Sequence, residues 1–192
     1  MEESKIRKSD RLLIIGGSAG SLEVLLDILP KLNPVSSFII VIVLHRKSGE
    51  DNMLEDLISF KSKIPFKETE DKVELEPGYL YVAPSDYHLL IENTGHISLD
   101  TSEKINYSRP SIDVAFESAA EVYGKNLTGV LLSGANADGT AGLEAIKKKG
   151  GTTIVQQPDT AEVAFMPLNA ILNSPPDLIL STSAILEYIN SL

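Results

Sequence analysis

Short apolar runs rich in β-branched residues alternate along this chain with segments in which apolar residues recur at helical spacing. The longest run, residues 38–44, has seven consecutive apolar residues, which is typical of a strand buried on both faces of a sheet. This alternation predicts an α/β fold with a doubly wound, mainly parallel sheet flanked by helices. The predicted strands are residues 11–15, 37–44, 127–132, 152–155 and 177–180, and the predicted helices are 21–29, 50–60, 111–123, 139–149, 167–172 and 182–190.

The spacing of apolar residues also predicts which side of two helices is buried. In each case the residues repeat at intervals that place them along one side of the helix, which we expect to pack against the sheet. The predicted inner side chains are Leu22, Leu25, Leu26 and Leu29 in the first helix, and Met53, Leu57 and Phe60 in the second.

The stretch from residue 64 to residue 99 has a different pattern. Short apolar segments at 79–83, 87–91 and 96–99 are separated by the turn sequences Pro84-Ser85-Asp86 and Asn93-Thr94-Gly95. This favours antiparallel strands inserted into the parallel fold. With no internal repeat or linker-like segment, we expect an N-terminal tail at 1–10 and one domain at 11–192.

Composition excludes several classes of function. The net charge of −10 would repel a nucleic-acid backbone. The basic run Lys147, Lys148 and Lys149 is better explained as the last turn of a helix. The absence of cysteine excludes thiolate nucleophiles and cysteine-based metal sites. No signal peptide is recognisable, and no apolar run reaches the roughly 20 residues that cross a bilayer. We therefore expect a cytoplasmic protein with no membrane insertion and no nucleic-acid partner.

A glycine-rich turn follows the first predicted strand. Its sequence, Gly16-Gly17-Ser18-Ala19-Gly20, fits the pattern G-x-S-x-G, in which a serine stands on a tight strand-to-helix turn. The next residue, Ala19, can then offer its backbone N–H to an oxyanion. The alternative is a phosphate-binding turn, but the glycine spacing is G-G-x-x-G rather than G-x-G-x-x-G, and no Gly-Lys-Ser/Thr follows. The pattern therefore favours Ser18 as a nucleophile.

Of the three histidines, only His45 directly follows a predicted buried strand. His88 and His96 lie in the antiparallel segment. The carboxyl edge of a parallel sheet is where a doubly wound fold binds its ligands, so His45 is the candidate general base.

An acid that orients the base is expected at the end of another strand. The sequence after residues 127–132 is Ser133-Gly134-Ala135-Asn136-Ala137-Asp138-Gly139. Asp138 precedes a predicted helix, so capping of that helix is an alternative explanation for it. The order Ser, His, Asp differs from the Ser, Asp, His order of the α/β-hydrolases.

Together these motifs resemble the catalytic domain of the chemotaxis protein-glutamate methylesterases (CheB). That family has its serine in G-A-S-T-G-G, its histidine in Q-H-M-P and its aspartate in T-G-M-G-x-D-G. The corresponding segments here are Gly16-Gly17-Ser18-Ala19-Gly20-Ser21, Leu44-His45-Arg46-Lys47 and Ser133-Gly134-Ala135-Asn136-Ala137-Asp138-Gly139. Further matches are Pro77-Gly78, Tyr81-Val82-Ala83-Pro84, Arg109-Pro110-Ser111-Ile112-Asp113-Val114-Ala115-Phe116 and Phe165-Met166-Pro167.

The resemblance implies a function and a set of site residues. Ser18, His45 and Asp138 would form a catalytic triad, with the backbone N–H groups of Ala19 and Ala135 as the oxyanion hole and Arg109 in substrate binding. The substrate would be a glutamate γ-methyl ester on the cytoplasmic helices of a methylated chemoreceptor. Deamidation of selected glutamines would use the same acyl chemistry. No metal and no organic cofactor is implied.

The sequence also departs from the family pattern. Ala135-Asn136 replaces Met-Gly, Arg46-Lys47 replaces Met-Pro, and Ser21 replaces a glycine. The receiver domain that often precedes the esterase has no counterpart, so we expect no phosphorylation control within the chain and allow for a separate regulatory protein. Two alternatives stay open: a catalytically silent module, favoured by the altered loops, and a nucleotide-binding doubly wound module.

Overall fold

The structure is a computed structural model that describes residues 11–34, 37–46 and 53–192. Six parallel strands form its main sheet. They are β1 (Arg11–Gly17), β2 (Phe38–Leu44), β3 (Leu80–Val82), β6 (Leu127–Leu131), β7 (Thr152–Gln156) and β8 (Leu178–Leu180). Their order across the sheet is β3-β2-β1-β6-β7-β8, so the chain builds one half outward from β1 and then returns to build the other. The predicted doubly wound parallel sheet is confirmed.

The centre of the sheet aligns the carboxyl ends of three strands. Gly17 at the end of β1 is paired with Leu44 at the end of β2, and Gly16 is paired with Leu131 at the end of β6. Because β1 lies where the strand order reverses, the loops after these strands diverge and leave room for a ligand between them.

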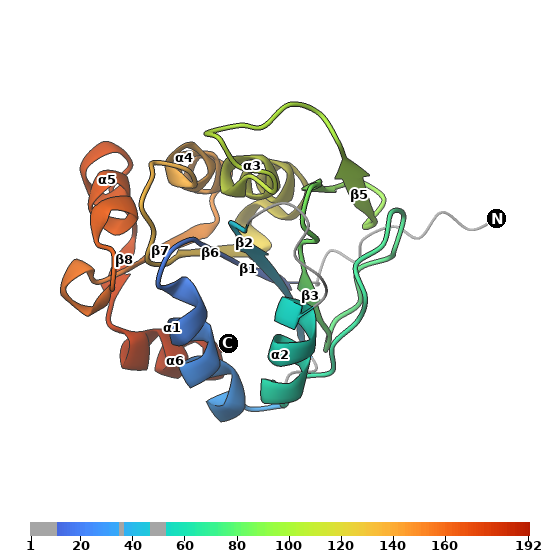
Figure 1. Cartoon of the computed structure of the whole chain (residues 1–192), viewed down its shortest axis with the longest axis horizontal. Coiled ribbons are helices and arrows are strands. Elements are labelled where there is room, and N and C mark those ends of the chain that lie inside the picture. The colour runs from blue at the N-terminus through green and yellow to red at the C-terminus, as the bar shows by residue number, and fades with distance from the viewer. Residues whose placement is uncertain (1–10, 35–36, 47–52) are drawn as a thin grey trace.

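Helices cover both faces of this sheet (Figure 1). One face carries α3 (Ile112–Tyr123), α4 (Thr140–Lys148) and α5 (Phe165–Asn173); the other carries α1 (Ser21–Ile28), α2 (Met53–Lys61) and α6 (Thr182–Asn190). Three short 3-10 turns span Leu29–Lys31, Gly124–Asn126 and Pro158–Thr160. Each face of the sheet has its own apolar core. None of the described helices is long and apolar enough to cross a membrane.

The antiparallel insertion is a two-stranded hairpin, β4 (His88–Ile91) with β5 (Ile97–Asp100), which packs into the core on the α3 side. The segment at 79–83 was expected to belong to this insertion, and that expectation is wrong. Its strand, β3, pairs in parallel with β2 through Ile40 and Leu80. All three β3 side chains are buried, because the strand is covered on both faces as in the rest of the parallel sheet.

The buried sides of two helices also differ from the prediction. In α2, Met53 is 71% exposed and Phe60 is 84% exposed, whereas Ile58 is buried. In the first predicted helix, Leu25 and Leu29 are buried as predicted, but Leu22 and Leu26 are only half-buried, and Val24 and Ile28 are buried in their place. The buried side of each helix is thus rotated from the predicted one, because apolar residues next to the predicted set also fit helical spacing and periodicity alone did not decide between them.

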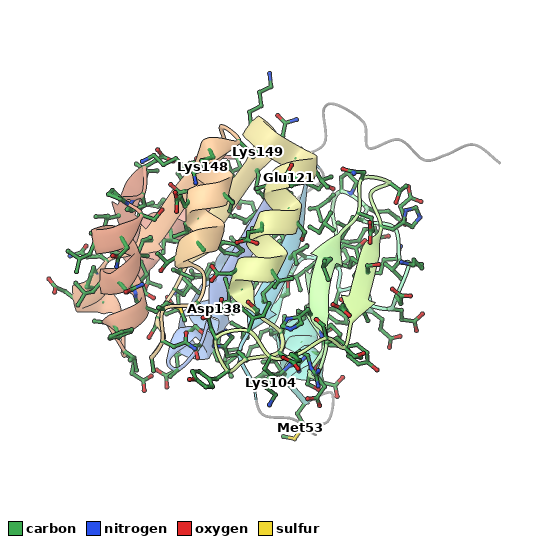
Figure 2. All side chains as sticks on the ribbon, turned by 90° about the horizontal axis from the view of Figure 1, so that it is seen from above. Met53, Lys104, Glu121, Asp138, Lys148 and Lys149 are labelled. Atoms are coloured by element: carbon green, nitrogen blue, oxygen red, sulfur yellow. The ribbon has the colours of Figure 1, made fainter. Side chains whose placement is uncertain are left out.

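The three lysines at the end of α4 are paired, as expected for the last turn of a helix. Lys148 pairs with Glu144, Lys149 pairs with Glu121, and Lys147 Nζ donates to the carbonyl of Pro175. Figure 2 shows Lys148, Lys149 and Glu121 at one end of α3 and α4 and Asp138 at the other. The predicted tail at 1–10 lies outside the described residues.

Candidate active site

Ser18 lies on the turn between β1 and α1. Its N–H donates to the carbonyl of Ser133 over 2.9 Å, and its own carbonyl accepts the N–H of Ser21 over 3.0 Å. Gly20, which precedes α1, has a φ of 79°, and a Cβ there would lie 2.5 Å from Glu162 Cβ. A glycine is therefore needed for both the backbone conformation and the close packing of the turn. The N–H groups of Ser18 and Ser21 thus already donate to carbonyl groups of the protein. This makes the turn a poorer phosphate-binding site.

His45 immediately follows β2, and Asp138 lies in the loop between β6 and α4. The N–H of His45 donates to the carbonyl of Gly17 over 3.1 Å, which ties the histidine to the strand that carries Ser18. His45 Nε2 lies 2.7 Å from Asp138 Oδ2, and the two side chains are 9% and 0% exposed. The structure thus brings together the base and the acid that the sequence predicted, across 93 residues of chain.

The Asp138 carboxylate caps a helix, but not the helix expected from the sequence. It accepts the N–H groups of Ile112 over 2.7 Å and Asp113 over 3.0 Å, both in the first turn of α3. Ser111 Oγ and Asn106 Nδ2 donate to Oδ1, the oxygen that also accepts the Asp113 N–H, each over 3.1 Å. The residue that precedes α4 is Gly139, which has no side-chain cap.

The groups that donate hydrogen bonds to Asp138 determine the charge of its carboxyl group. Burial raises the pKa of Asp138, but the hydrogen bond from His45 and the α3 N–H groups outweigh burial and hold the pKa well below its usual range. The carboxylate is therefore ionised at neutral pH and accepts only. His45 Nε2 must then donate to it, which leaves Nδ1 with the lone pair that a general base needs.

A second buried acid, Asp113, lies beside the first. Its side chain accepts the N–H of Gly142 over 2.8 Å and Asn106 Nδ2 over 3.1 Å. Burial, and next the negative charge of Asp138, raise the pKa of Asp113 to about 7.

Ser133 joins the serine turn to the acid loop. Fully buried, it donates its hydroxyl to the carbonyl of Ala19 over 2.7 Å and accepts the N–H of Val163 over 2.9 Å. Ala19 and Ala135 are both exposed, and within the described ranges their N–H groups donate no hydrogen bond. Both N–H groups are thus available to a ligand.

A cavity of about 390 Å³ opens beside Ser18 and His45. Its other walls come from α1, α2 and the end of β2, and are mostly apolar: Ser21, Leu22, Leu44, Arg46, Met53, Leu54 and Leu57. Ser18 and His45 share this cavity, but no hydrogen bond joins Ser18 Oγ to the His45 ring in the described part of the chain.

The two residues that follow His45, Arg46 and Lys47, depart from the family pattern. Arg46 is held inside the protein: Nη1 donates to Glu55 over 2.9 Å and Nη2 to the carbonyl of Ala83 over 2.6 Å. It links α2 to the end of β3. Lys47 lies outside the described residues.

The remaining sequence candidates are engaged elsewhere. His88 is buried, with Nδ1 accepting the N–H of Ser111 and Nε2 facing the carbonyl of Glu103. His96 lies in the hairpin next to Thr94. Arg109 Nη1 donates to the carbonyls of Thr101 and Ser102, 2.7 Å each, and Arg109 is not among the cavity-lining residues. Its predicted role in substrate binding stays a prediction.

Sequence reasoning missed the residues around the predicted triad. These are Asn106, Ser111, Asp113, Ser133 and Asn136. All of them except Asn106 stand in segments that resemble the family, which was the available signal. The described residues contain no group of three or more His, Cys, Asp or Glu side chains that could hold a metal ion.

Comparison with known proteins gives one consistent family. The profile of the CheB methylesterase family matches residues 13–189. A Leptospira interrogans protein with the provisional name protein-glutamate methylesterase/protein-glutamine glutaminase is 45% identical, over 91% of this chain and 91% of its own length. A Thermotoga maritima protein with the same name, not provisional, is 36% identical over 93% of this chain and 53% of its own length. The crystal structure of the Thermotoga maritima CheB methylesterase catalytic domain superposes with a TM-score of 0.90 at 34% identity, covering 95% of this chain and 98% of that one.

Proposed function

The chain belongs to the CheB methylesterase family and is a protein-glutamate methylesterase of that family, and we propose that Ser18, His45 and Asp138 carry out the hydrolysis. The observation that carries this proposal is the 2.7 Å contact between His45 Nε2 and Asp138 Oδ2 beside the cavity that Ser18 lines. It supports an oriented histidine whose second ring nitrogen, Nδ1, carries the lone pair that a base needs.

In the first half of the reaction, Ser18 Oγ attacks the ester carbonyl carbon while its proton passes to His45 Nδ1. The buried Asp138 carboxylate stabilises the imidazolium that forms. The carbon–oxygen bond to the methoxy group then breaks, and Nδ1 returns the proton to the departing oxygen, which leaves as methanol. The product of this half is an acyl-enzyme on Ser18.

In the second half, water attacks the acyl-enzyme after giving a proton to His45 Nδ1. The carbon–oxygen bond to Ser18 breaks, Oγ regains that proton, and the free glutamate carboxylic acid loses its own proton to solvent. In both halves the oxyanion lies within reach of the N–H groups of Ala19 and Ala135. Those donors, together with the N-terminus of α1, supply the charge stabilisation.

The substrate proposed is a glutamate methyl ester on the cytoplasmic helices of a chemoreceptor, which places the enzyme in the cytoplasm. The family supports this assignment. The cavity supports it as well, because its apolar walls on α1 and α2 suit the methyl ester and the apolar residues of a helix that presents it.

Glutamine deamidation is a second candidate activity. The names of the Leptospira interrogans and Thermotoga maritima relatives include protein-glutamine glutaminase. The same acyl-enzyme would form, with ammonia in place of methanol as the leaving group.

The test is to incubate the protein with methyl-labelled receptor and to measure methanol release. Ser18→Ala should reduce the rate by roughly 10⁴–10⁶-fold. The matched control is Ser59→Ala, which removes an exposed hydroxyl from α2 and should retain the wild-type rate. Methanol release by Ser18→Ala close to that of wild type would refute the proposed nucleophile.

A further inference from the structure

Asn136 holds a position between the proposed base and the proposed acid. In the family pattern T-G-M-G-x-D-G that this loop resembles, the position is a glycine. Asn136 Oδ1 accepts the N–H of Asp138 over 3.2 Å. Its Nδ2 lies 3.5 Å from His45 Nδ1 and 3.5 Å from the carbonyl oxygen of Asn106.

The surroundings fix which end of this amide faces the histidine. In the neutral imidazole that acts as the base, His45 Nδ1 carries the lone pair, because Nε2 carries the proton that is donated to the ionised Asp138. With the amide reversed, its oxygen would face that lone pair and the Asn106 carbonyl, and its NH₂ would face the N–H of Asp138. All three contacts would then be repulsive, so the amide must present its N–H to His45.

His45 Nδ1 is also the atom that hands a proton to the leaving group. That group must come within hydrogen-bond reach of Nδ1, on the side of the same lone pair that Asn136 Nδ2 faces. In the tetrahedral intermediate Nδ1 has taken the proton of Ser18 and no longer accepts from Asn136, so the Asn136 N–H donates to the leaving atom beside it.

The two leaving groups differ in what they can offer a second donor. An ester oxygen has two lone pairs, one for the proton from His45 and one for the N–H of Asn136. An amide nitrogen in the tetrahedral intermediate has a single lone pair, which the proton from His45 occupies, and its own hydrogens face those of Asn136. A polar group left without a partner in such a site discriminates strongly against a substrate.

We propose that Asn136 is a specificity-determining residue that favours methyl esters over amides by donating a hydrogen bond to the departing oxygen. This inference rests on the proposed function and refines it. In the ester reaction the carbon–oxygen bond breaks and methanol leaves with the His45 proton. In the amide reaction the carbon–nitrogen bond breaks, and ammonia leaves without help from Asn136.

The experiment compares one receptor cytoplasmic fragment in two forms, with either a glutamate methyl ester or a glutamine at the same site. The rates of methanol and ammonia release give the ratio of kcat/KM for ester to that for amide. Asn136→Gly removes the donor and should lower this ratio about tenfold, the equivalent of one hydrogen bond. Asn136→Asp replaces the donor with an acceptor and should lower it further. Because the ratio is measured on one preparation, it does not depend on the fraction of each variant that folds.

The control is Asn93→Gly, in the exposed turn between β4 and β5, which should leave the ratio unchanged. If wild type releases no measurable ammonia, the appearance of ammonia release in the Asn136 variants supports the inference. Equal losses of methanol release and ammonia release would overturn the inference, and so would ammonia release that stays undetectable in both variants. In either case, ester hydrolysis by the wild-type protein would still support the proposed function. A wild-type protein that hydrolyses neither form would overturn both.

Discussion

Asp113 and Asp138 are bridged by a single side-chain nitrogen, because Asn106 Nδ2 donates to Asp113 Oδ2 and to Asp138 Oδ1, each over 3.1 Å. Two carboxyl groups in one buried site do not both ionise readily. The pKa of Asp113 is raised to about 7, while the pKa of Asp138 is held low by His45 and the α3 N–H groups. Below about pH 7 the site therefore holds one proton at Asp113 and one negative charge at Asp138.

This pairing predicts a pH-dependent stability difference between wild type and Asp113→Asn. A carboxyl whose folded pKa is raised binds a proton more tightly in the folded state than in the unfolded state. Its contribution therefore falls as pH rises from the unfolded value of about 4 to the folded value near 7. Asp113→Asn has no carboxyl at this position and does not lose stability in this way. The free energy of unfolding of the variant, minus that of wild type, should therefore be larger at about pH 8 than at about pH 5. Urea denaturation at both pH values measures this. Parallel changes in the two proteins would contradict the prediction.

Activity on a glutamate methyl ester should fall as the pH is lowered below neutral. His45 must be unprotonated to accept the proton of Ser18. Asp138 does not cause this loss, because its lowered pKa keeps the carboxylate ionised through that range. The measurement is kcat/KM across the pH range. A rate that stays flat down to about pH 5, well below the reference value for histidine, would count against His45 as the base.

The three proposed catalytic residues should act as one unit. In a Ser18→Ala background there is no Oγ proton for His45 to accept, so His45→Ala or Asp138→Asn should cause little additional loss. Single-turnover rates of the single and double variants give the comparison. Losses that multiply would show that the residues contribute independently.

Gly20→Ala should reduce activity as well as stability. A positive φ costs an alanine about 1–2 kcal/mol, and the added Cβ would also press on Glu162 and on the Ser133 hydroxyl beneath the serine turn. Gly150→Ala is a matched control: it shares a positive φ of 81°, but its Cβ would meet nothing closer than 3.9 Å. Thermal denaturation should show a loss in both variants, and ester hydrolysis should fall only in Gly20→Ala. Equal activity in the two variants would contradict the coupling between this turn and the site.

The sequence was informative wherever a residue's position follows from the strand that precedes it. Ser18, His45 and the Asp138 loop each come after a buried parallel strand, and parallel strands end at one edge of the sheet, so their proximity could be predicted. The family pattern around each residue then supplied the chemistry.

Contacts that depend on how separate elements pack were not predictable in this way. Asp138 caps α3, which begins 26 residues earlier in the chain, and no local pattern reveals that contact. Strand β3 is three residues long, and its apolar run fits a parallel edge strand as well as a hairpin. Met53 and Phe60 fit a buried stripe by spacing, yet the adjacent stripe around Ile58 was buried instead.

The strand order β2-β1-β6 has a consequence for how the enzyme gains activity. Ser18 and Asp138 are separated by 120 residues of chain, and they meet only after β6 has closed onto β1 across the helices and the hairpin between them. Pairing over such sequence distances is slow compared with helix formation, because a long loop must close first. During refolding from denaturant, the circular dichroism signal of the helices should therefore recover before esterase activity does. Esterase activity should appear only once β6 has paired with β1 and the two halves of the sheet are joined.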